Sequence, residues 1–167
     1  MKISIYKTVF IISAAVSINS CSKQETNPLL DLRPDVPVSI TNATEFRPDP
    51  TVTTSIAAGG NIQIVLSIPS QIGRMITEIT KIAASTSYTK IQSSGTSGFY
   101  VATPIAVNGT TYTYNTSTAE YFVKNPVSAS NPTAKANTEL ALRFYFLVTL
   151  DDGTKLVTLP VRVLVLA

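Results

Sequence analysis

Residues 138–166 read TELALRFYFLVTL, then DDGT, then KLVTLPVRVLVL, and in both long stretches apolar side chains recur at every second position. The first stretch places six apolar residues on one face: Leu140, Leu142, Phe144, Phe146, Val148 and Leu150. The second stretch does the same with five: Val157, Leu159, Val161, Val163 and Val165. Because successive side chains of a strand point to opposite sides of its sheet, this period of two predicts two strands, each with one buried face.

The segment between these strands predicts a tight turn and therefore an antiparallel hairpin. Asp152-Gly153 is a turn dipeptide, since Asp bonds its own backbone and Gly adopts a positive φ without strain. Folding the strands about this dipeptide brings the two apolar faces together, as a shared core requires. The expected cross-strand pairs are Val148 with Val157, Phe146 with Leu159, and Phe144 with Val161.

Pro160 constrains the hairpin because proline has no N–H to donate to a ladder. With a two-residue turn, Pro160 falls in a hydrogen-bonded pair with Tyr145, where an N–H is needed. A four-residue loop over 151–154 keeps the same neighbours but makes that pair non-hydrogen-bonded. We therefore expect either the longer loop or a bulge near Pro160.

The rest of the chain predicts further short strands separated by Pro- and Gly-rich turns. Residues 71–85 carry apolar side chains at helical spacing, but Ile and Thr dominate them, so we interpret the segment as a strand and keep a helix as the alternative. Asn108-Gly109 predicts the turn of a second hairpin. The other expected strands cover residues 36–40, 52–56, 61–68, 88–92, 99–102 and 120–124.

Seven to nine strands at a spacing of roughly 8–12 residues predict an all-β fold, a single antiparallel β-sandwich. The pattern resembles the immunoglobulin-like and fibronectin-like sandwich domains of bacterial surface lipoproteins. Residues 125–137 hold two prolines and no apolar period, so we expect a long loop there.

The amino-terminal residues have the features of a secretory signal. Lys2 and Lys7 form a short positive segment before an apolar run of 11 residues, 8–18. A helix that spans a bilayer needs about 20 residues, so this run fits the apolar region of a signal peptide. Residues 18–21 (INSC) resemble the lipobox of bacterial lipoproteins, with an aliphatic residue three positions before Cys21 and a small residue one before it.

This resemblance implies that the Cys21 thiol carries diacylglycerol, that the chain is cut before it, and that the new amino group is acylated. Ser22, in place of Asp, implies the outer membrane of the bacterial envelope, with the leaflet left open. The chain then divides into a signal peptide (1–20), a lipidated cysteine with a flexible tether (21–35) and a β-sandwich domain (36–167). An ordinary cleaved signal that leaves a free cysteine and a retained transmembrane anchor are the two alternatives.

The composition excludes several classes of function. The chain has no histidine, which removes Ser-His-Asp catalysis and most zinc and copper sites. Lys2 and Lys7 are two of the 13 basic residues, so eleven basic and ten acidic residues remain from Cys21 onward, too balanced for nucleic acid. The acidic residues are not concentrated in any segment. We therefore expect no enzyme activity, no catalytic residue, no metal and no cofactor.

Two tyrosines are the candidate ligand-binding residues. Tyr112 and Tyr114 point to the same side of one expected strand and could form a platform for a sugar ring or a protein. The competing interpretation, which we favour, is that these rings bridge the strand surface and the rim of the core. The carboxylates of Asp151 and Asp152 could suggest calcium, but a hairpin turn explains the same residues.

These observations lead to three hypotheses of function. The first is a lipid-anchored, non-catalytic binding or adhesion module for a glycan or a protein. The second is a structural subunit of a cell-envelope assembly, which Leu147, Leu156 and Leu164 suggest if the second face of the hairpin is exposed. The third is a hydrolase, which would need an acidic cleft.

Overall fold

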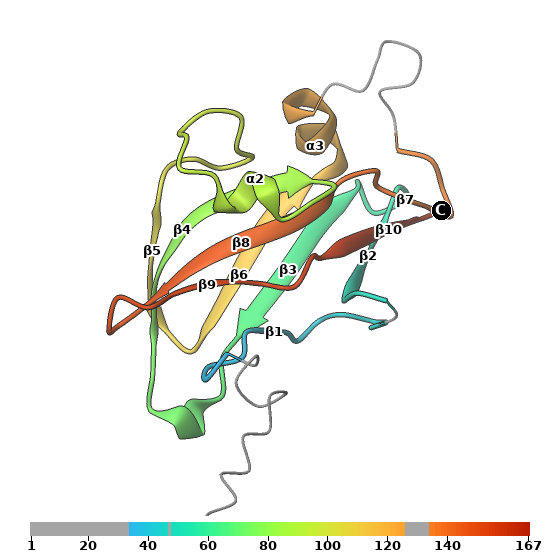
Figure 1. Ribbon diagram of the computed structural model, residues 1–167. Helices are drawn as coiled ribbons and strands as arrows, with labels where there is room; N and C mark the ends of the chain where they lie inside the picture. The colour runs from blue at the N-terminus through green and yellow to red at the C-terminus, as the bar shows by residue number, and fades with distance from the viewer. Residues whose placement is uncertain (1–33, 47, 126–133) are drawn as a thin grey trace, which may run out of the picture. The chain divides into compact units, whose positions relative to one another are not determined.

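The computed structural model describes residues 34–46, 48–125 and 134–167, all of which lie in one compact unit, Pro34–Ala167. The described residues form ten strands and three short helices (Figure 1). The strands are β1 (Ser39–Ile40), β2 (Thr51–Ser55), β3 (Asn61–Ser67), β4 (Ile76–Ser85), β5 (Ile105–Gly109), β6 (Thr111–Ser117), β7 (Thr138–Glu139), β8 (Arg143–Leu150), β9 (Lys155–Val157) and β10 (Arg162–Leu166). The helices are the 3₁₀-helix η1 (Ser70–Ile72), α2 (Thr89–Gln92) and α3 (Thr118–Lys124).

The strands form three small sheets, with the orders β1-β3-β6, β2-β10-β7 and β5-β4-β8-β9. Pairing is antiparallel throughout these sheets except between β2 and β10, which run parallel. The predicted β class is therefore confirmed. None of the helices in the described segments has the length and apolarity to cross a membrane.

One main apolar core joins strands of all three sheets. It is built from alternate residues of β3, β8 and β10 and from residues of β4 that are three apart because the register shifts there, among them Ile62, Ile64, Leu66, Ile79, Ile82, Phe144, Phe146, Val163 and Val165, each at most 1% exposed. Fully burying an aliphatic or aromatic side chain of this size stabilises a fold by roughly 1.5–3 kcal/mol relative to leaving it in water. The period of two in the sequence is thus the pattern of this core in β3, β8 and β10.

A second, smaller apolar cluster lies on the other face of the β4–β8 pair. Tyr145, Ala83 and Ile91 are buried there, and α2 packs over both strands (Figure 1). Tyr88 covers the Tyr145 ring edge-on, with 4.9 Å between ring centroids. Strand β8 is therefore covered on both faces, which explains why its second face also carries large side chains.

The register of the C-terminal hairpin is partly as predicted. Phe144 pairs with Val161, as expected. Nearer the turn the prediction was wrong by one residue, because Val148 pairs with Leu156. Leu156 therefore packs against the main core, and Val157 packs against the second cluster.

A bulge beside Pro160 causes this change of register, which confirms the predicted irregularity. Between the Leu147–Val157 and Phe144–Val161 pairs, two residues of β8 face three residues of the other strand. Such an extra residue turns the following side chains to the opposite face. Leu159, expected in the core, is 59% exposed as a result.

Thr158 supplies the hydrogen bonds that the bulge would otherwise remove. Its N–H donates to the Phe146 carbonyl at 3.0 Å. In the other direction the Phe146 N–H donates to the Thr158 hydroxyl oxygen at 3.2 Å. Thr158 is only 2% exposed, so its hydroxyl replaces a backbone carbonyl as the acceptor in a place that water does not reach.

Two predicted strands are helices. Residues 88–92 contain α2, and residues 120–124 lie within α3. The Ser117 hydroxyl caps α3 by accepting from the Glu120 N–H at 3.1 Å, and Lys124 lies in its last turn. A Ser followed three residues later by Glu is a helix-start pattern, and it outweighs the β-branched and aromatic residues that suggested a strand.

The strand interpretation of residues 71–85 is confirmed from Ile76 onward, with η1 before it. The hairpin expected at Asn108-Gly109 does not form. β5 pairs with β4 and β6 pairs with β3, so the chain passes from one sheet to another at this point. Most of the long loop expected over 125–137 falls outside the described residues.

Candidate functional site

The two candidate tyrosines lie against the core side of β6. Tyr114 is 6% exposed, and its ring meets that of Phe146 edge-on, with 5.6 Å between centroids. Burial raises the pKa of the Tyr114 hydroxyl. Tyr112 is half-buried and packs on the same core. These positions match the favoured interpretation of tyrosines at the rim of the core, and the Tyr114 ring has no face open to a ligand.

A closed polar network fastens α3 to its neighbours. The Thr116 hydroxyl donates to the Glu120 carboxylate at 2.8 Å, so the Tyr100 hydroxyl, 2.7 Å away, donates to Thr116. Lys124 pairs with Glu120 at 2.7 Å and donates to the Tyr100 carbonyl at 2.9 Å. The Lys124 ammonium also lies 4.5 Å from the centroid of the Tyr100 ring.

The pKa shifts in this network indicate that its role is structural. Lys124 and then Thr116 hold the pKa of the Glu120 carboxyl below its usual range. Burial raises the pKa of the Tyr100 hydroxyl to about 12. Glu120 therefore stays ionised and Tyr100 stays neutral near pH 7, and each group already has a hydrogen-bonding partner. None of these residues is among the candidates expected from the sequence, although the spacing of Glu120 and Lys124, four residues apart, is that of neighbours on one helical face.

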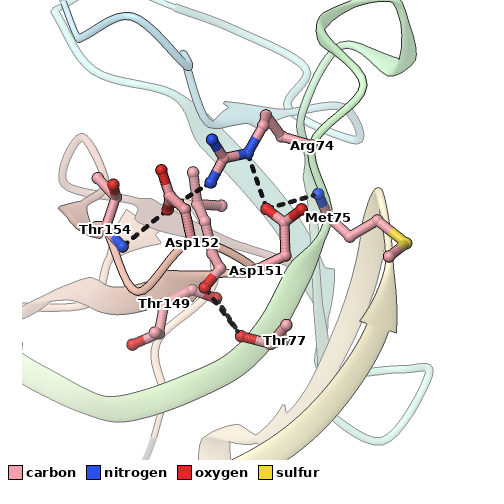
Figure 2. A network of polar contacts seen from close by, with 8 residues as sticks. Arg74, Met75, Thr77, Thr149, Asp151, Asp152 and Thr154 are labelled. Atoms are coloured by element: carbon pink, nitrogen blue, oxygen red, sulfur yellow. Dashed lines mark hydrogen bonds and ion pairs between the residues drawn. The ribbon is translucent and has the colours of Figure 1, made fainter.

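A second network joins the start of β4 to the β8–β9 turn (Figure 2). The Arg74 Nε donates to the Asp151 carboxylate at 2.8 Å, and another Arg74 nitrogen pairs with Asp152. The Met75 N–H points to the same Asp151 oxygen at 3.4 Å, while the Asp151 N–H donates to the Met75 carbonyl at 3.0 Å. Asp152 in turn accepts from the Thr154 N–H at 2.8 Å.

This geometry supports the turn interpretation of the two aspartates. Arg74 is the main cause that lowers the pKa of both carboxyls, so the guanidinium already compensates their charge. A calcium ion would have to displace Arg74 from both. Gly153, with φ of +83°, closes the turn after Asp151 and Asp152, and the Leu150 N–H donates to the Thr154 carbonyl at 2.9 Å. Within the described segments, no three His, Cys, Asp or Glu residues are grouped so as to hold a metal ion.

Two lysines hold the loop that follows α2. The Lys81 ammonium donates to the Ser93 carbonyl at 2.6 Å and lies 4.4 Å from the centroid of the Phe99 ring. Lys90 lies 5.0 Å from the same centroid and donates to the Ser97 carbonyl at 2.9 Å. Cation–π contacts of this kind contribute about 0.5–1 kcal/mol when exposed. The two lysines therefore fix the loop above the second apolar cluster.

A shallow groove of about 370 Å³ lies beside the start of α3. The turn after β2 forms one side and the first turns of α3 form the other. Its lining is Ile56, Gly59, Gly60, Thr118, Ala119, Phe122 and Ala134. Gly60 has φ of +68°, and a Cβ there would lie 2.2 Å from the Thr118 hydroxyl oxygen. Only glycine therefore lets the turn approach the helix this closely.

The remaining candidates from the sequence are dispersed. Leu147, Leu156 and Leu164 are all half-buried, which removes the expected exposed patch. Leu156 packs against the main core and Leu147 against the second cluster. Cys21 lies outside the described residues.

Comparisons with known proteins identify no relative of this chain. No protein-family model, no curated protein and no solved structure matches the chain.

Proposed function

We propose that this protein is a lipid-anchored lipoprotein of the bacterial outer membrane whose β domain is a non-catalytic binding or adhesion module. The observation that carries the proposal is the INSC sequence at 18–21, placed directly after a basic start and an apolar run of 11 residues. Acylation of Cys21 would supply three chains, and two already suffice for stable anchoring. The membrane is thus the first partner.

We propose further that the three sheets correspond to an immunoglobulin-like β-sandwich. The support is the main core, in which alternate residues of β3 and β8, strands of different sheets, are buried together. The passage of the chain between sheets at Gly109–Thr111, from β5 to β6, is the kind of connection that sandwich domains use.

The groove beside α3 is the ligand site that we propose for this module. Its volume of about 370 Å³ falls in the range of small-molecule sites, roughly 300–1,000 Å³. Phe122 contributes an aromatic ring to the lining, and Thr118 contributes a hydroxyl group. A sugar has both an apolar ring face and hydroxyl groups, so one glycan residue fits this combination. The other candidate ligand is a protein with a side chain that combines an apolar surface and a hydroxyl group.

The anchor is tested by mass spectrometry of the N-terminus of the native protein. We expect an acylated Cys21 at the first position, and we expect the Cys21→Ser chain to keep its first 20 residues and carry no lipid. A native chain that retains these residues, or that lacks the fatty acyl groups, would contradict the anchor.

Glycan-array binding tests the groove with a matched pair of variants. Ala119→Trp fills the groove and should abolish binding, whereas Val123→Trp adds the same ring at an 80% exposed position of the same helix and should not. Tyr112→Ala and Tyr114→Ala test the sites expected from the sequence. Equal binding by Ala119→Trp and wild type would exclude the groove, and absence of binding to glycans and to envelope extracts would exclude the module.

A structural role in an envelope assembly is the second candidate. Its support is that three large apolar side chains from separate segments lie at the surface, namely Phe46 at 63%, Leu159 at 59% and Val123 at 80% exposure. Recovery of a stoichiometric partner from solubilised membranes, lost in a Phe46→Ser or Leu159→Ser chain, would support this role over glycan binding.

A further inference from the structure

Strand β6 is a long, regular sheet edge, and no strand of the described residues pairs with its outer side. It is the outer strand of the order β1-β3-β6, and its register with β3 runs unbroken from Asn61–Ser117 to Ser67–Thr111. The other strand at the border of this sheet, β1, has two residues. An outer strand presents a row of unpaired N–H and C=O groups along its free side, and this row can pair with another strand.

The hydrogen bonds identify the groups that face outward. The Ile68 N–H donates to the Thr110 carbonyl, and at the other end the Thr118 N–H donates to the Gly60 carbonyl. Because bonded and non-bonded pairs alternate in an antiparallel ladder, the even-numbered residues of β6 bond to β3. The backbone groups of Thr111, Thr113 and Asn115 then point away from β3, and the described residues provide no strand to accept them.

The outer strands β9, β5 and β2 have features that hinder pairing with a further strand, and β6 lacks these features. The short strand β9 begins with Lys155 and runs into the bulge at Pro160. Strand β5 pairs with β4 through a register shift. The free side of β2 is bonded at one end by the Thr44 N–H and at the other by the Gly60 N–H. Strand β6, with the sequence TYTYNTS, contains no charge, no proline and no bulge.

We propose that β6 is an interface through which two copies of this chain pair, antiparallel and related by a two-fold axis. With Tyr114 opposite Tyr114, all seven residues of each β6 overlap, and the outward backbone groups of Thr113 meet those of Asn115 in the partner strand. The two sheets join into one continuous sheet of six strands, with both cores on the same side.

The chemistry of β6 favours a second copy as the occupant. A two-fold axis brings each strand against itself, so any charged residue near the centre would face its own charge. β6 has none, and its exposed side chains are Thr111, Thr113 and Asn115, which both donate and accept hydrogen bonds. Gln63 already bonds Asn115 within one chain at 3.3 Å, which shows that this face supports cross-strand pairing.

The association is expected to be weak in solution. Stable dimers bury about 1,200–2,000 Å² in total, and one strand edge contributes less than that. On a membrane, the lipid anchor proposed above would raise the effective concentration, in the way that linking two binding partners does. The pairing itself does not require the anchor.

Sedimentation equilibrium of the full chain in detergent tests the interface. We expect concentration-dependent dimers for wild type and for Thr113→Val, which keeps the outward N–H. Thr113→Pro removes that N–H without removing a β3 bond, and it should weaken association by about tenfold or more. Thr113→Lys keeps the N–H but places like charges near the axis, so it is the second disrupting variant, with Leu159→Lys as the control for charge alone.

Three outcomes are decisive. Loss of dimers in Thr113→Pro and Thr113→Lys, with retention in Thr113→Val and Leu159→Lys, supports the interface. A wild-type chain that stays monomeric up to about 1 mM, or a Thr113→Lys chain that dimerises like wild type, overturns it. Dimers that persist in Cys21→Ser show that the interface holds even if the anchor proposal fails.

Discussion

The C-terminal hairpin has two arms, residues 138–150 and residues 155–166. They have the same alternation of apolar side chains in the sequence but different structures. The first arm breaks near its beginning, after the two residues of β7, and then continues as β8, an unbroken strand of eight residues between β4 and β9. The second arm breaks near its middle, between β9 and β10, and in both arms the two strands belong to different sheets. The difference begins at Pro160, where an N–H is missing and an extra residue is accommodated.

The bulge at Pro160 allows one segment to contribute strands to two different sheets. Before the bulge, β9 extends the four-stranded sheet next to β8. After it, β10 pairs with β2 and β7, while Phe144–Val161 is the pair that links the two arms at the junction. At this junction the Thr158 hydroxyl oxygen accepts a hydrogen bond from the Phe146 N–H, which therefore has a partner.

The largest effect is expected for Phe144→Ala in the first arm. Phe144 is fully buried and its ring meets that of Tyr100 edge-on at 5.1 Å, so the cavity should lower the free energy of unfolding by about 3–5 kcal/mol. Leu159→Ala in the second arm should change it by less than about 0.5 kcal/mol, because Leu159 is mostly in water. Urea unfolding of both variants measures the comparison, and similar losses would show that the two arms do not differ in this way.

A smaller effect is expected for Thr158→Val at the bulge. The substitution keeps the shape of the side chain but leaves the buried Phe146 N–H without its acceptor, which costs about 1–3 kcal/mol. Thr158→Ser keeps the hydroxyl and should lose less than Thr158→Val. If the serine variant is the less stable of the two in urea unfolding, the hydroxyl is not the acceptor that matters.

Pro160→Ala should have a still smaller effect, about 1 kcal/mol or less. The fixed φ of proline restricts the unfolded chain, and this advantage is lost in alanine. The bulge itself should remain, because Thr158 still bonds Phe146. Thermal unfolding measures the loss, and a gain in stability for Pro160→Ala would mean that the proline strains this arm.

The smallest effect concerns the turn that joins the arms, and it depends on pH. Arg74 lowers the folded-state pKa of Asp151 and Asp152 below the unfolded value of about 3.9, so their contribution is present above that pH and is lost as the pH falls through the folded values. Both carboxylates are exposed, and solvent screens the effect. Acid unfolding of Arg74→Gln should therefore depend less steeply on pH below about 4 than that of wild type. Equal slopes would show that the Arg74 pairs do not affect folding.

Part of the candidate chemistry was visible in the sequence and part was not. The Asp152-Gly153 turn followed from local backbone chemistry, and the structure has it. The partner of these aspartates did not, since Arg74 is 77 residues away from Asp151 and no local pattern connects them. The Tyr100–Thr116–Glu120 network likewise joins a loop, a strand and a helix, so its members are recognisable only when the three segments are in contact.

By itself, the sequence determined the β class, the position of the last hairpin and the need for an irregularity at Pro160. These properties depend on alternation and on a missing N–H, which act over a few neighbouring residues. The tertiary structure alone decided that Leu156 enters the core in place of Leu159 and that β5 and β6 pair with different strands. Each of these choices is set by which distant backbone and side-chain groups supply hydrogen bonds and apolar contacts, and the local pattern carries no information about them.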